Sequence, residues 1–135
     1  MSAASDYLEN KLLDHVLTST GYTSPNASLY LALFTSDGGL ENNTSGSQTE
    51  ISTSGTAYTR QTIAFGSASS GSASNSGTVT FSAATANWGT VSHVAIMDAS
   101  SGGNVLFHGA VTTSKTIESG DTFQVSSGNL TISLA

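Results

Sequence analysis

The sequence predicts a mainly β protein, an antiparallel β-sandwich or small barrel with one N-terminal α-helix. Short segments in which apolar and polar residues alternate recur along the chain, separated by turn residues about every 8–12 positions. One stretch near the start has helical periodicity instead. Serine, threonine and glycine contribute 25, 19 and 14 of the 135 residues, as expected for many turns and polar strand faces.

The helix is expected over residues 6–19. Asp6 is the expected N-cap, and Glu9 follows at the spacing of a capping box. Gly21 is expected to close the helix in the left-handed conformation. Apolar residues recur along one side and widen into a stripe: Leu8, Leu12, Leu13, Val16 and Leu17. The helix therefore has one apolar face and one polar face.

Residues 28–135 are expected to form a β-body, within a single domain of residues 1–135. Residues 29–34 are apolar at every position, which predicts a strand covered on both faces. The helix is the expected cover of one face. Residues 36–56 are polar and rich in Gly and Ser, and they are interpreted as a long flexible loop.

The rest of the chain predicts further short strands joined by turns. Residues 58–65 alternate in polarity, and residues 66–77 are of low complexity and predict a flexible loop. Later strands are expected at 79–81, 91–97, 105–111, 123–125 and 130–134. Residues 91–97 and 105–111 are expected to pair as a hairpin.

Charge and composition exclude several classes of protein. The net charge is −6 and the cations are Lys11, Arg60 and Lys115, far apart in sequence, which argues against nucleic-acid binding. Without cysteine there is no disulfide or thiolate chemistry. No apolar run is long enough to span a membrane, and no signal peptide is visible, so synthesis and assembly in a cytoplasm are expected.

No catalytic, cofactor or metal site is predicted. His93 and His108 lie on the two strands of the predicted hairpin, and with Asp98 they offer three metal ligands. His15 lies on the helix with no reason to join them, so the histidines are interpreted as half-polar strand positions. The carboxylates are scattered, no nucleophile elbow is present, and the Gly-rich turns lack the helix and lysine of a phosphate loop.

Six residues are candidates for contacts between subunits: Leu8, Leu12, Val16, Tyr58, Arg60 and Trp88. The first three form the apolar stripe of the helix. Trp88 is expected either to pack over the end of the core, which is favoured, or to anchor a subunit contact. Arg60 is expected to pair with an acid, either local or on a neighbouring subunit.

Five segments in their order along the chain resemble a family of small virion proteins of tailed bacteriophages, which carry the labels tail-fibre or head-decoration protein. These segments are residues 6–17, 29–35, Ala57-Tyr58-Thr59-Arg60-Gln61, Trp88-Gly89-Thr90-Val91-Ser92-His93 and 103–109. The resemblance covers nearly the whole chain except the loops at 42–56 and 66–77. It implies a structural role, since the family has no recognised catalytic residues.

The leading hypothesis is a non-enzymatic structural protein of a tailed-phage virion, and within that class an oligomeric capsid cement protein. Its expected partners are copies of itself and other virion proteins, notably the major capsid protein, with no nucleic acid or membrane. It is expected in the virion, after assembly in the host bacterial cytoplasm. The alternatives are a tail-fibre or baseplate component, or a carbohydrate-binding β-sandwich in which Tyr22, Tyr58 and Trp88 stack on sugar rings.

Overall fold

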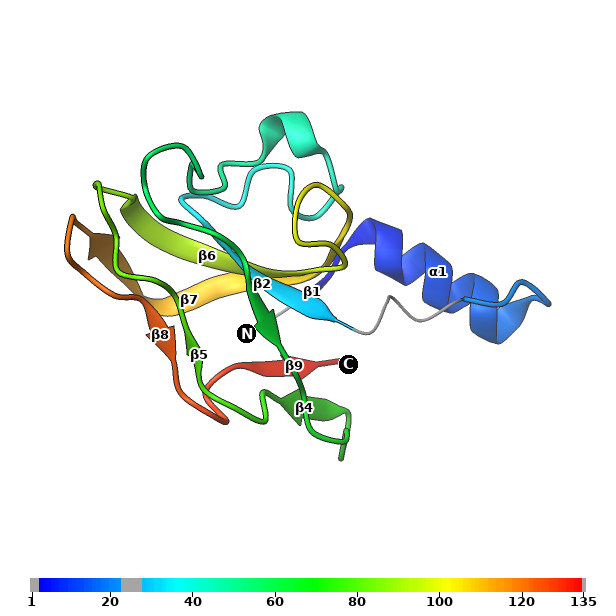
Figure 1. The fold of residues 1–135 in the computed structure, drawn as a ribbon. Coiled ribbons are helices and arrows are strands. Elements are labelled where there is room, and N and C mark those ends of the chain that lie inside the picture. The colour runs from blue at the N-terminus through cyan, green and yellow to red at the C-terminus, as the bar shows by residue number, and fades with distance from the viewer. Residues whose placement is uncertain (1–2, 23–27, 135) are drawn as a thin grey trace.

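A computed structural model of the chain describes residues 3–22 and 28–134 (Figure 1). It confirms a mainly β fold with one α-helix and antiparallel pairing, and its three sheets are not closed into a barrel. The elements are β1 (Ala3–Ala4), α1 (Asp6–Leu17), β2 (Leu29–Phe34), a 3-10 turn η1 (Ser45–Ser47), β3 (Gln61–Ile63), β4 (Ser72–Ser74), β5 (Val79–Thr80), β6 (Gly89–Met97), β7 (Val105–Ile117), β8 (Gln124–Val125) and β9 (Thr131–Ser133).

The largest sheet has five antiparallel strands in the order β1-β7-β6-β2-β3. The predicted hairpin is present as β6 and β7, in which Val94 pairs with Gly109, and β2 has the predicted bounds. Two smaller sheets pair β4 with β9 and β5 with β8. The strand expected over 58–65 is confined to β3, because Ala57 has a positive φ of 61° and Tyr58 turns into the core.

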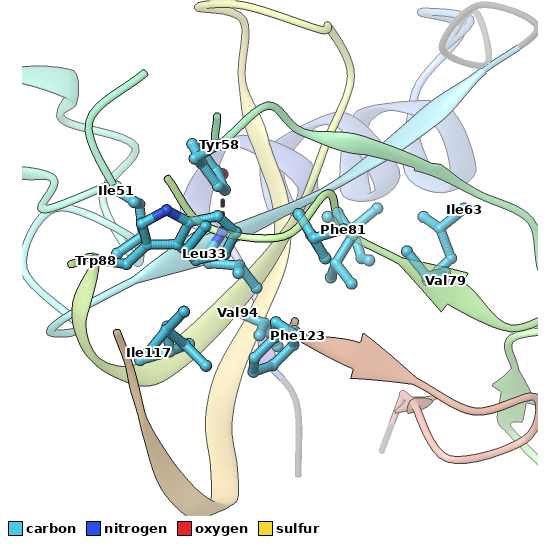
Figure 2. Close-up of a cluster of buried hydrophobic side chains, with 14 residues drawn as sticks. Leu33, Ile51, Tyr58, Ile63, Val79, Phe81, Trp88, Val94, Ile117 and Phe123 are labelled. Atoms are coloured by element: carbon cyan, nitrogen blue, oxygen red, sulfur yellow. Dashed lines mark hydrogen bonds between the residues drawn. The ribbon is translucent and has the colours of Figure 1, made fainter. Parts of the chain in front are cut away.

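The main core collects side chains from β2, β3, β5, β6 and β7 (Figure 2). Its centre is aromatic. The ring of Tyr58 stacks on Phe81 at 5.9 Å between centroids, and Trp88 meets Tyr58 edge-on at 5.4 Å. Phe123 meets Phe81 edge-on at 5.8 Å. Such offset and edge-on contacts stabilise an aromatic cluster beyond the burial of its area.

The second face of β2 is covered by the segment 36–56, and the expectation that α1 covers it is wrong. Ala32 and Phe34 pack there against Leu40, which has no exposed surface. The helix cannot reach this face because it follows β1, and β1 pairs with β7 at the opposite edge of the sheet from β2 and β3. Figure 1 shows α1 projecting from the β-body.

The two segments expected as loops both contain ordered contacts. In the segment 36–56, Phe34 pairs with Glu50, and Ile51 joins the main core. In the segment 66–77, β4 pairs with β9. Serine and threonine hydroxyls bridge these two strands, as in Ser74 to Thr131 at 2.8 Å. The strand at 130–134 is predicted from its alternation, whereas β4 is a Ser-Ala-Ser segment without large apolar residues, so the sequence pattern does not predict this pairing.

Both helix ends differ from the prediction. The N-cap is Ser5, whose Oγ accepts a hydrogen bond from the Leu8 N–H at 3.3 Å and donates to the Val105 carbonyl. The helix ends at Leu17, two residues early, because Thr18 is extended and its N–H and hydroxyl both donate to the Asp14 carbonyl. The expected left-handed glycine is therefore not used at this end.

Candidate functional site

The helix α1 is held to the body by its first half and leaves its second half in solvent. Leu8 is 5% exposed and packs with Ala4 and Leu106. The side chains of Leu13, Val16 and Leu17 are 55%, 74% and 73% exposed. These three and Leu134 are the large hydrophobic side chains that lie exposed in residues 3–22 and 28–134.

An apolar groove lies beside the helix, with a volume of about 390 Å³. Its lining includes Leu8, Leu12, Tyr22, Leu29, Phe107 and Leu134. Leu134 therefore lies at this groove, together with Leu8 and Leu12 from the packed first half of α1. The large exposed hydrophobic side chains of the described residues are therefore on α1 or at the groove beside it.

Within the described residues, no helix is long and apolar enough to cross a membrane.

Acidic side chains occupy the same side of α1 as its exposed apolar residues. Steps of three or four residues keep side chains on one side of a helix, and such steps join Asp6, Glu9, Leu13 and Val16. Leu17, four residues after Leu13, lies on the same side. We call these five residues the α1 face. It is acidic in its first turn and apolar in its last two turns.

A third acid lies beside the start of this face. One carboxylate oxygen each from Asp6, Glu9 and Glu41 lie within 4.8 Å of one another, and all three residues are exposed. Glu41 also accepts the Asp6 N–H through its carbonyl at 2.8 Å, and its carboxylate lies 2.7 Å from His108 Nε2. Acids at a helix N-terminus are favoured by the helix dipole, so the cluster is explained without a metal ion.

Arg60 pairs with a local acid, which decides between the two pairings that the sequence left open. Its side chain is 6% exposed and forms an ion pair with Glu50 at 2.7 Å. Burial lowers the pKa of Arg60, but hydrogen bonding and the charge of Glu50 outweigh burial and leave that pKa raised. Burial, followed by the charge of Glu50, raises the pKa of the neighbouring Tyr58 well above its ordinary value.

Tyr58 and Trp88 lie in the core, at 1% and 5% exposure. Tyr58 Oη accepts a hydrogen bond from the Leu33 N–H at 3.1 Å, and Trp88 Nε1 donates to the Thr56 carbonyl at 2.8 Å. The favoured interpretation of Trp88 as a core residue is confirmed. Because neither ring is open to solvent, neither is available to stack on a sugar.

The histidines of the hairpin do not converge with Asp98. The register pairs His93 with Ala110, whereas His108 pairs with Ala95. His93 Nδ1 lies 2.8 Å from the Ser92 hydroxyl, while His108 contacts Glu41 as described above. Asp98 accepts hydrogen bonds from the backbone and side chain of Asn104. Each of the three side chains thus has a separate partner.

Of the predicted assembly residues, the structure brings Leu8, Leu12 and Val16 together along α1 and separates them from Tyr58, Arg60 and Trp88 in the body. Sequence reasoning missed the acidic start of the α1 face and the groove. The acidic start of the face could have been found from the sequence, because Asp6 and Glu9 precede Leu13 and Val16 at helical spacing. The groove could not have been predicted from a sequence pattern, because its lining residues come from segments far apart in the chain.

Comparison with known proteins gives one family. No curated protein matches the chain. A family model described as "Podophage GP4 fiber I protein gp80" matches residues 3–133, which is nearly the whole chain. This agrees with the resemblance of the sequence to tailed-phage virion proteins labelled tail-fibre or head-decoration protein. The chain therefore belongs to the family of the podophage GP4 fiber I protein gp80, a family of structural proteins of the phage virion.

Proposed function

We propose that this chain is a fibre subunit of a podophage virion that acts by binding copies of itself and other virion proteins, without catalysis. The observation that carries the proposal is the family match over residues 3–133. The match includes both α1 and the β-body, so the proposal applies to the described fold as a whole.

The distribution of side chains supports a binding role. The arginine of the body is engaged internally, in its ion pair with Glu50. The strands outside the core present mainly serine and threonine, for example Ser72 and Thr131. The concentrated apolar surface is at α1. Exposed apolar patches of this kind mark interaction sites in soluble proteins.

Capsid decoration, with the major capsid protein as partner, is the competing assignment within the virion. A cement protein needs the same compact body and the same kind of attachment surface, because it stabilises the shell by binding its assembled state. We favour the fibre assignment because the matching family is described as a fibre protein.

Electron cryomicroscopy of purified particles, combined with quantification of this chain by mass spectrometry, tests the proposal. Density that projects from the tail region, with a low copy number, is the expected result. Density over capsid junctions in tens to hundreds of copies would replace the fibre assignment with decoration. Absence of the chain from purified particles would overturn both assignments.

A further inference from the structure

We infer that the α1 face and the adjoining groove dock a different virion protein, one that presents an apolar surface flanked by lysine or arginine. The inference rests on the proposed function, since it names the surface by which the subunit attaches to its neighbours. In this proposal α1 is the element that attaches the subunit to another virion protein, and copies of the chain contact one another through the β-body.

The helix needs a partner on physical grounds. A helix of 12 residues is marginal in water unless an apolar face is packed against something. The body supplies that packing for Leu8 and, in part, for Leu12. Beyond them, Val16 and Leu17 remain about three quarters exposed. The groove lies along the neighbouring side of the same helix, where Leu8 and Leu12 line it, so an occupant of the α1 face that extends around the helix also reaches the groove.

The carboxylates at the start of the α1 face favour a partner with basic side chains. Asp6 and Glu9 lie on the same side of the helix as Leu13 and Val16, and Glu41 lies beside them. A protein that covers the apolar half of this face therefore comes close to three exposed carboxylates. Basic side chains at the rim of the partner would be attracted to these carboxylates, and acidic ones repelled.

A second copy of this chain fits the α1 face poorly. It carries a net charge of −6 and the same acidic turn. Of its three cations, Arg60 is buried against Glu50, and Lys11 lies on the opposite side of α1, above the Tyr7 ring. A second copy that docked through another of its faces would have the exposed Lys11 and Lys115 to set against three carboxylates. Pairing two α1 faces would bring like charges together, which disfavours self-docking at this site.

Site-specific photo-crosslinking within the particle tests the identity of the occupant. A photoreactive amino acid at position 16 replaces a side chain that is 74% exposed, so the fold is retained. We expect crosslinks to a different virion protein, at an apolar segment that contains lysine or arginine. A crosslink to a second copy, or to a segment with acidic flanks, would overturn the inference.

Rebinding of the purified chain to particles that lack it tests the two halves of the face separately. Leu13→Ser combined with Leu17→Ser is expected to weaken rebinding by tenfold or more, because an exposed apolar anchor is removed. Asp6→Asn combined with Glu9→Gln is expected to weaken rebinding and to reduce its sensitivity to salt. Circular dichroism verifies that α1 is retained in each variant.

Two controls match these variants. Lys11→Gln changes one charge on the opposite side of the same helix, and Glu118→Gln removes an exposed acid in the turn between β7 and β8. Both should rebind like the unaltered chain. Sedimentation of the purified chain should give the same oligomeric state for all variants. If the leucine variants rebind normally while the chain is still found in particles, the inference fails and the proposed function stands.

Discussion

The guanidinium of Arg60 binds the carboxylate of Glu50 through two parallel hydrogen bonds, from Nε to Oε1 at 2.8 Å and from Nη2 to Oε2 at 2.7 Å. Its remaining Nη1 donates to the carbonyls of Ala99 and Gly102, each at 2.8 Å. One cation thus joins the segment 36–56, the start of β3 and the connection between β6 and β7. Bidentate pairs of this kind fix geometry as well as energy.

Arg60→Met should destabilise the protein strongly. We expect a loss of roughly 2–4 kcal/mol in the free energy of unfolding, less than for a fully buried pair because Glu50 is 23% exposed. The loss arises because two carbonyls lose their donor and the Glu50 carboxylate loses its counterion, although it keeps the hydrogen bond from the Tyr58 hydroxyl. Urea unfolding measures it. Lys115→Met, at an exposed cation, should change stability by less than about 0.5 kcal/mol. Equal effects for the two variants would contradict an internal role for the pair.

Leu40→Ala tests whether the segment 36–56 is part of the folded core. We expect a loss of about 2–5 kcal/mol in the free energy of unfolding, because a fully buried side chain would be replaced by a cavity beside Phe34 and Met97. Leu13→Ala, at a 55% exposed site, is the matched control and should cost far less. A small effect at position 40 would show that this segment does not cover β2 in solution.

Gly39→Ala should be poorly tolerated. Gly39 has a φ of +71°, and a Cβ there would lie 2.4 Å from the Thr44 carbonyl oxygen. Backbone strain alone costs about 1–3 kcal/mol, and the steric clash adds to it. Gly46→Ala in the same segment is the control, since a Cβ there meets nothing within 4 Å. Thermal unfolding of the two variants should differ clearly, and similar melting temperatures would argue against this loop conformation.

Stability should fall at alkaline pH because of Tyr58. Burial, and then the charge of Glu50, raise the pKa of its phenol well above the ordinary value. The unfolded chain loses this proton near pH 10, whereas the folded chain keeps it. The contribution to stability is therefore complete below about pH 10 and declines above it, by up to about 1.4 kcal/mol per pH unit.

Urea unfolding at several pH values between about 8 and 11 measures this decline. Tyr58→Phe removes the titrating group, so its stability should depend less steeply on pH, although its stability at neutral pH is lower because the hydrogen bonds to Leu33 and Glu50 are weakened or lost. An unchanged slope in this variant would assign the decline to other groups.

The sequence by itself determined the fold class and the elements with a strong period. Alternation and turn spacing predicted the antiparallel β fold, the bounds of β2 and the hairpin of β6 and β7. The period of three and four residues predicted α1 and its apolar stripe. These features are local, so they depend on which side chains share a face and not on what lies opposite.

The tertiary structure decided which segments meet. Leu40, and not the helix, covers β2, because the sheet order places β1 and α1 beside β7. The sequence identified Arg60 as the partner of some acid, but only the fold brings Glu50 to it. The groove beside α1 likewise combines residues from distant segments, such as Leu12 and Leu134. A periodic pattern shows that a face is apolar, whereas its cover depends on long-range strand order, which the pattern does not encode.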